Sequence, residues 1–255
     1  MNKPIYFFLT LFTLTACGGG GSDGNSPAAP LTPAATISDY AGFYTGVVTP
    51  PSNGEQYLVD LLVSTSGEVR VITEFNEQLN GSITVDGTSF EISGLHSFAP
   101  IAGEIGLVYG EFLETGSATG SFTNNGLSGT TVFSVGNSSI SAEKIVIAET
   151  ASISLLQGNY VDLTFSSQLS VDADGLINGQ DFVGCLYSGF VELLDPNVNI
   201  YKAQVIVENC GALSVTYDGL ASYIPAETFE DQTADILVLS GDNNSLAITV
   251  VLLPN

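Results

Sequence analysis

The fold is decided by segments such as residues 201–208, which read YKAQVIVE. Tyr, Ala and two Val residues occupy every second position, and three of the four positions between them are polar. This period of two places alternate side chains on opposite faces of a β-strand, so one face of the segment is predicted to be buried. Residues 69–75 (VRVITEF) show the same alternation, and residues 246–252 (LAITVVL) place four apolar side chains on one face.

Turn dipeptides separate these segments at the spacing of short strands, a pattern typical of antiparallel barrels and sandwiches. They are Ser66-Gly67, Asn80-Gly81, Asp86-Gly87, Asn125-Gly126, Asp174-Gly175 and Gly241-Asp242. We therefore predict an all-β chain with two antiparallel meander units of about eight strands each, barrel-like, with β-sandwiches as the alternative. A short helix is conceivable only within residues 139–149, where the β-branched side chains also favour a strand.

A weak internal repeat divides the folded part into a first β unit, residues 39–148, and a second, residues 149–255. Each unit opens on a Gly-x-Tyr triplet, at residues 42–44 and 158–160. If the units are duplicates, the two tyrosines occupy equivalent inward positions on the first strands. Each hydroxyl then needs a backbone carbonyl, because a buried phenol seeks a hydrogen-bond partner.

Glycine spacing supports the same repeat. Gly81 follows Gly67 by 14 residues, and Gly189 follows Gly175 by the same interval. We therefore expect Gly81 and Gly189 to be structurally equivalent.

The chain is strongly acidic, with 27 Asp plus Glu residues against 4 Lys plus Arg and a formal net charge of −23. Such a surface repels phosphate backbones and anionic headgroups, so nucleic-acid partners are excluded and attachment to a membrane would have to come from a lipid. The charge suits solubility or a cationic partner.

The N-terminus resembles a bacterial lipoprotein signal. Lys3 supplies a positive charge, and residues 4–16 form an apolar run that is shorter than the ~20 residues of a membrane-spanning helix. Residues 14–17 (LTAC) resemble the lipobox. The resemblance implies that residues 1–16 are a signal peptide that is removed, and that Cys17 carries diacylglycerol and is acylated, for example with palmitate. Gly18, in place of Asp, resembles the class sorted to the outer membrane.

Residues 17–38 are rich in Gly, Ser, Pro, Ala and Thr and are predicted to be a flexible tether behind the lipidated cysteine. Two other cysteines remain, Cys185 and Cys210. Because an exported chain meets an oxidising compartment, we predict that they form a disulfide, with a reactive free thiol as the alternative.

The only metal candidate lies in residues 170–181, SVDADGLINGQD. Asp172, Asp174 and Asp181 match positions of a calcium-binding loop. The flanking residues favour strands where that loop needs helices, and Asp-Ala-Asp-Gly is a good hairpin turn, so we predict a turn and leave a weak calcium site as the alternative. His96, the single histidine, is expected in a loop. We therefore expect no transition metal and no cofactor.

The sequence also resembles three groups of β-barrel proteins. The Gly-x-Tyr openings resemble the Gly-x-Trp start of lipocalin-like and avidin-like barrels. The glycine run at residues 18–21 resembles the start of surface lipoproteins of the transferrin-binding and factor-H-binding types, which carry β-barrel domains. The second half is similar to a group of proteobacterial lipoproteins at Asp174-Gly175, Gly184-Cys185, Tyr187-Ser188-Gly189, Asn209-Cys210 and Tyr217-x-Gly219-Leu220-Ala221.

These features predict a monomeric envelope protein, anchored by lipid in the outer membrane and facing the periplasm or the cell surface. Its predicted role is non-enzymatic, either binding or structural, with an unidentified protein or small-molecule partner. A binder of small molecules would need an unfilled barrel interior. A carboxylate-based hydrolase is the minor alternative, because the acidic pairs Glu111 with Glu114 and Glu227 with Glu230 are better explained as solvated surface.

Overall fold

A computed structural model describes residues 35–50, 54–101, 107–162, 167–226, 228–229 and 232–255. The predicted signal peptide, the lipidation site Cys17 and most of the predicted tether lie outside these residues, as do Glu227 and Glu230. Within the described part, no helix is long and apolar enough to cross a membrane.

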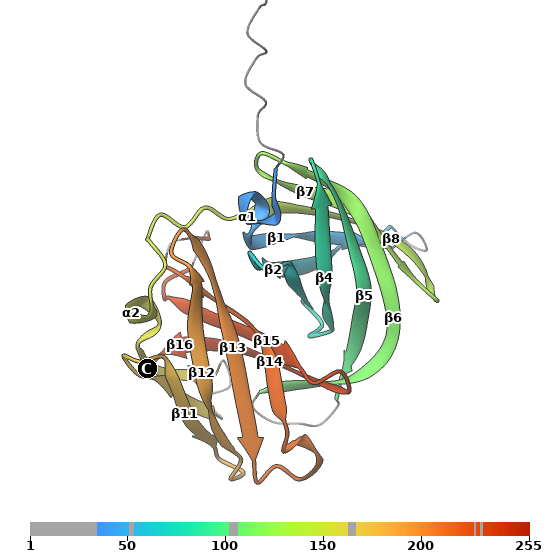
Figure 1. The fold of residues 1–255 in the computed structure, drawn as a ribbon. Helices are drawn as coiled ribbons and strands as arrows, with labels where there is room; N and C mark the ends of the chain where they lie inside the picture. The colour runs from blue at the N-terminus through green and yellow to red at the C-terminus, as the bar shows by residue number, and fades with distance from the viewer. Residues whose placement is uncertain (1–34, 51–53, 102–106, 163–166, 227, 230–231) are drawn as a thin grey trace, which may run out of the picture. The chain divides into compact units, whose positions relative to one another are not determined.

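The first half forms a closed antiparallel barrel (Figure 1). Each strand pairs with the next in sequence, and β1 pairs with β8 to close the ring. The short helix α1 (Ile37–Tyr40) precedes the first strand. The strands are β1 (Gly42–Thr49), β2 (Tyr57–Val63), β3 (Glu68–Thr73), β4 (Gln78–Asp86), β5 (Ser89–Pro100), β6 (Val108–Thr123), β7 (Gly126–Phe133) and β8 (Gly136–Lys144).

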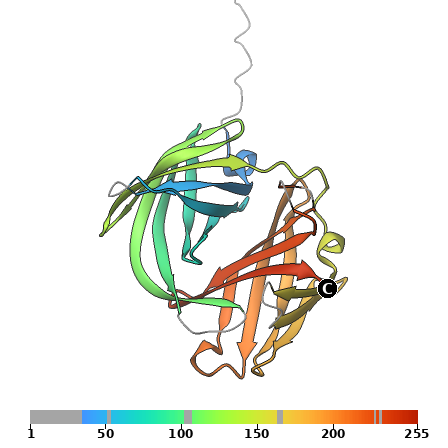
Figure 2. The same cartoon turned by 180° about the vertical axis from the view of Figure 1, so that it is seen from behind.

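The second half forms another closed antiparallel barrel, in which β16 pairs with both β15 and β9 (Figure 2). It is preceded by the short helix α2 (Ile153–Leu156) and contains a 3₁₀ turn, η1 (Gly211–Leu213). The strands are β9 (Gly158–Asp162), β10 (Ser167–Val171), β11 (Leu176–Asp181), β12 (Leu186–Asp195), β13 (Val198–Glu208), β14 (Thr216–Ile224), β15 (Ile236–Asp242) and β16 (Leu246–Pro254).

The predicted all-β fold with eight-stranded, barrel-like units is confirmed among the described residues, and barrels replace the alternative of sandwiches. The prediction that a short helix could lie only within residues 139–149 is wrong. Strand β8 occupies the start of residues 139–149, while α1 begins inside the predicted tether. This helix is held by local contacts: the Asp39 carboxylate accepts the Thr36 backbone N–H at 2.7 Å, and Ile37 packs against the barrel core.

The predicted equivalence of Tyr44 and Tyr160 is confirmed by their contacts. Both are buried, at 1% and 3% exposure, and each belongs to the core cluster of its own barrel. The Tyr160 hydroxyl donates to the Leu156 carbonyl at 2.8 Å, and the Tyr44 hydroxyl donates to the Tyr40 carbonyl. Each bond therefore ties the first strand to the last residue of the preceding short helix.

The glycine repeat is confirmed by the strand register. Gly81 lies opposite Val69 across the β3–β4 pair, and Gly189 lies opposite Ile177 across the β11–β12 pair. The turn glycines that precede them by 14 residues have φ angles of +86° and +82°, a left-handed conformation that side chains disfavour. The two barrels thus share one design in this region.

The barrels contact each other through the outer faces of several strands. Among the described residues, Phe43 on β1 and Leu62 on β2 join Ile200, Leu220 and Val238 of the second barrel in one buried apolar cluster. Strand β16 also pairs with β6 through residues 246–249 and 108–111. Strands at this interface therefore carry apolar side chains on both faces. This explains why Leu61, Leu62 and Val63 form a continuous apolar segment in which polar residues do not alternate with apolar ones.

Arg70 forms the polar part of this interface. Its side chain is 8% exposed and forms ion pairs with Glu68, on its own strand, and with Asp242, in the second barrel. It also donates to the Asp218 carbonyl at 3.0 Å. The Asp242 carboxylate accepts a further bond from the Asn80 side chain at 2.7 Å. The only arginine of the sequence thus joins the two barrels.

The buried tyrosines are expected to make the folded protein less stable at high pH. Burial raises the pKa of Tyr160 to about 12, above the ordinary value of 10.0, and also raises the pKa of Tyr44, Tyr187 and Tyr217. The unfolded chain releases these protons at lower pH than the folded chain. Their contribution to stability is therefore complete below pH ~10 and is lost as the pH rises toward the folded pKa values.

We expect the free energy of unfolding to fall by about 1 kcal/mol per buried tyrosine between pH 9 and pH 11. Urea melts at each pH measure the fall, and tyrosinate absorbance reports the ionisation. Tyr160→Phe should show a shallower pH dependence than the wild type. A free energy of unfolding that stays constant to pH 11 would contradict the prediction.

Candidate functional site: an apolar cavity in the first barrel

The interior of the first barrel encloses a cavity of about 410 Å³. This volume lies in the range of small-molecule sites. Most of the lining is aliphatic or aromatic, and it comes from all eight strands of the barrel, β1 to β8. The lining includes Leu61, Val63, Val71, Ile83, Phe90 and Ile92.

One end of this barrel is closed by aromatic side chains. The Tyr40 ring of α1 stacks on Phe122 with centroids 4.2 Å apart and planes 7° from parallel. Phe90 contacts the same Phe122 ring at a centroid distance of 5.1 Å, and Tyr44 lies at 6.3 Å. The short helix therefore acts as part of a plug, held in place by the hydroxyl bond from β1.

The opposite end is open and apolar. Its lining includes Pro50, which follows β1, Tyr57, which begins β2, and Val135, in the turn between β7 and β8. Val135 is 90% exposed, and Leu113 on β6 is 60% exposed. Large apolar side chains at this exposure carry a solvation cost that a ligand could relieve. We call this end the mouth of the cavity.

A β-bulge shapes the mouth. The β5–β6 pairing shifts register after Ser97, which lies opposite Glu114, whereas Phe98 lies opposite Phe112. One extra residue, Leu113, therefore stands in β6 at this point. As a result Leu113 and its neighbour Glu114 both line the cavity, although adjacent strand residues normally face opposite ways.

The charged groups that line the cavity are carboxylates close to the mouth. Glu77 precedes β4, and its Oε1 accepts the Ser97 hydroxyl at 2.7 Å. Glu114 accepts the Ser134 backbone N–H at 2.9 Å. Ser97 is 2% exposed, whereas Glu77 and Glu114 are half-buried, so the two carboxylates stand where the apolar interior meets water. Among the described lining residues there is no Lys, Arg or His.

The second barrel is packed differently. Its core cluster contains, among the described residues, five tyrosines: Tyr109, Tyr160, Tyr187, Tyr201 and Tyr217. The core cluster of the first barrel contains one, Tyr44. Large inward side chains fill a barrel of this strand number, whereas Val, Leu, Ile and Ala leave space.

The cavity-lining residues were missed by sequence reasoning, although a signal exists. Tyr187 and Tyr201 stand at inward positions of β12 and β13, whereas the inward positions of the matching strands β4 and β5 in the first half hold Leu79, Ile83, Phe90, Ile92 and Leu95. Comparing the two halves position by position would have indicated which barrel is less filled.

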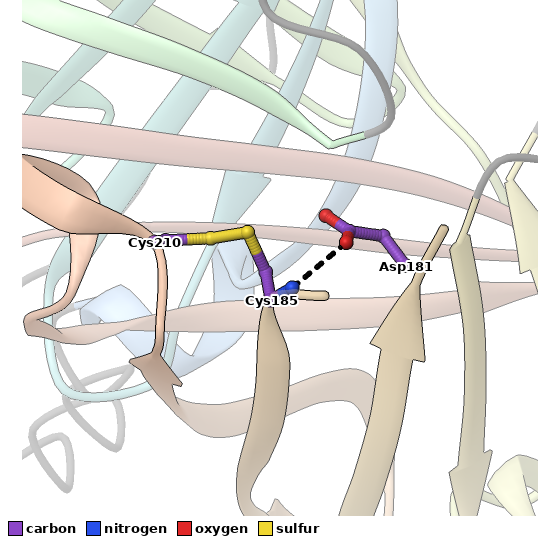
Figure 3. A group of neighbouring side chains, drawn as sticks. All are labelled: Asp181, Cys185 and Cys210. Atoms are coloured by element: carbon purple, nitrogen blue, oxygen red, sulfur yellow. Dashed lines mark hydrogen bonds between the residues drawn. A yellow bond between two sulfur atoms is a disulfide. The ribbon is translucent and has the colours of Figure 1, made fainter. Parts of the chain in front are cut away.

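Cys185 and Cys210 lie at disulfide-bonding distance, with Cα atoms 5.1 Å apart (Figure 3). Asp181 stands beside them. Its Oδ1 accepts the backbone N–H groups of residues 183, 184 and 185 at 2.9–3.0 Å, and its Oδ2 accepts the Tyr187 hydroxyl at 2.7 Å. This carboxylate therefore organises the turn that carries Cys185.

The three aspartates of the calcium candidate are not brought together. Asp172 Oδ1 accepts the N–H groups of Asp174 and Leu176, each at 2.9 Å, as expected for a turn. Asp181 lies at the opposite end of β11, and its oxygens are bonded as described above. Among the described residues, the group that could chelate is Asp181 with the two cysteines, whose sulfurs are already paired.

His96 is in strand β5, so its placement in a loop was wrong. Its ring packs edge-on against Phe112 at a centroid distance of 5.5 Å. The acidic pair on β6 is divided: Glu114 lines the cavity, and Glu111 is exposed and pairs across to β16.

Neither a protein-family model nor a curated protein matches the sequence. A solved structure of the vaccine antigen Transferrin Binding Protein B from Haemophilus parasuis Hp5, determined as a point mutant, is similar over 83% of this chain and 75% of its own. The identity is 8% and the TM-score 0.24. This similarity carries no argument about the fold, so the assignment of two barrels is based on the strand pairing of this chain alone.

Proposed function

We propose that this chain is a non-enzymatic binding protein whose first barrel holds the apolar part of a small molecule. The cavity of about 410 Å³ carries the proposal, because it is lined by aliphatic side chains, closed at one end and open at the other. Each methylene that moves from water into such a site contributes about 0.8 kcal/mol. An alkyl chain of ~10 carbons would gain about 8 kcal/mol before the entropic cost of binding.

In this proposal the protein is exported and anchored in the outer membrane through a lipid on Cys17. The lipobox-like residues 14–17 support this placement. The second barrel has a supporting role, because tyrosines occupy its core and its outer face packs on the first barrel.

Filling the cavity should abolish binding of an apolar probe. Ala118 on β6 lines the cavity and is 2% exposed, so Ala118→Phe places a ring in the space the ligand needs. We expect N-phenyl-1-naphthylamine to bind the wild type with enhanced fluorescence and to bind this variant at least tenfold more weakly.

Thr119→Phe is the matched control, because the next residue on the same strand is exposed and faces away from the cavity. Circular dichroism and thermal melts check that both variants fold. Equal binding by the wild type and Ala118→Phe, or probe binding that only Thr119→Phe removes, would place the ligand elsewhere.

A further inference from the structure

We infer that the polar end of the ligand is cationic, an ammonium-type group on an apolar chain. The inference rests on the proposed function and adds the charge of the head group. It comes from the position of Glu77 and Glu114, which line the cavity close to its mouth.

The two carboxylates stand on one side of the mouth, on adjoining parts of the sheet. Glu77 reaches Ser97 on β5 by a 2.7 Å hydrogen bond, and Ser97 lies directly opposite Glu114 on β6. Because the Ser97 hydroxyl donates its proton to Glu77, it has none to offer an anionic head group. A head group in this position therefore meets negative charge and hydrogen-bond acceptors.

The cations of the described chain lie elsewhere. Arg70 is occupied by Glu68 and Asp242 on the outer face of β3. Lys144 ends β8 at the plugged end, where its Nζ lies 6.0 Å from the centroid of the Tyr44 ring. Lys202 is exposed on β13 of the second barrel. Within the described residues, a carboxylate or phosphate ligand would find no cationic partner at the mouth.

The two carboxylates should make the affinity of a ligand depend on the charge of its head group. An ammonium entering the mouth gains attraction from both carboxylates, while an anion of the same chain length is repelled by both. The groups are partly solvated, so each pair contributes the modest amount typical of exposed ion pairs. Over both pairs, we expect an alkylammonium to bind about tenfold more tightly than the matching carboxylate.

The test compares head groups on one alkyl chain. Decyltrimethylammonium, decyl maltoside and decanoate, each below its micelle concentration, would displace N-phenyl-1-naphthylamine from the wild-type protein. The same series is run with the double variant Glu77→Gln and Glu114→Gln. The matched control is Glu91→Gln with Glu143→Gln, which removes two exposed carboxylates of the same barrel away from the cavity lining.

We expect the order ammonium, then maltoside, then carboxylate, weakened by added salt, in the wild type and the control. The Glu77 and Glu114 variant should bind all three with similar affinity. Equal affinities in the wild type, or a preference for ammonium that survives in this variant, would overturn the inference and leave the binding function intact. Failure of every compound and of the probe itself would overturn both.

Discussion

Replacing Arg70 with Met is expected to lower the free energy of unfolding by about 3–5 kcal/mol. The Arg70 side chain is 8% exposed, and its guanidinium donates to the Glu68 and Asp242 carboxylates and to the Asp218 carbonyl. Methionine keeps most of the apolar stem but leaves the Asp242 carboxylate, itself only 12% exposed, without its cation. Breaking one partner of a buried pair is costly because the remaining charge is poorly solvated.

Urea denaturation followed by circular dichroism measures this loss. Lys202→Met removes the same charge from an exposed position and should change stability by less than about 0.5 kcal/mol. Adding Asp242→Asn to Arg70→Met should restore part of the loss, because the stranded charge is removed. A loss for Arg70→Met no larger than that for Lys202→Met would show that the ion pairs do not hold the barrels together.

Replacing both Cys185 and Cys210 with Ala is expected to lower the free energy of unfolding by about 3 kcal/mol. The bond closes a loop with a sequence separation of 25 residues, and its loss gives the unfolded chain more conformational freedom. The adjoining turn retains the Asp181 carboxylate as acceptor for its backbone N–H groups, so the strands should keep their native register.

Melts with and without a reducing agent separate this effect from packing changes. The wild type should lose stability when reduced, and the double Ala variant should be insensitive to the reducing agent. Alkylation of two thiols in the folded, unreduced wild type, together with unchanged melts under reduction, would contradict the disulfide.

Much of the fold could be predicted because local patterns determine it. Alternation of apolar and polar residues identified β13 and β3, and glycine spacing located equivalent turns in the two halves, since positive φ angles demand glycine there. The four-residue helices could not be predicted, because tertiary packing of residues such as Ile37 and Leu156 stabilises them more than helix propensity does.

The functional features depend on contacts between distant residues. Arg70 and Asp242 are separated by 172 positions, and nothing near either residue indicates the other. Side chains from all eight strands of the first barrel line the cavity, so no single segment of the sequence indicates that a cavity is present. The carboxylates at its mouth are two among 27 acidic residues, and no local pattern distinguishes Glu77 and Glu114 from the others.

A crystal structure of the full folded chain with an ω-bromo-alkyltrimethylammonium compound tests the central claim most directly, because bromine can be located by its anomalous scattering. We predict a bromine peak inside the first barrel, near Val63, Ile83 and Phe90, with the ammonium between the mouth residues Glu77 and Glu114. A first barrel that holds no bromine at saturating ligand, or a ligand bound only outside it, would contradict the account.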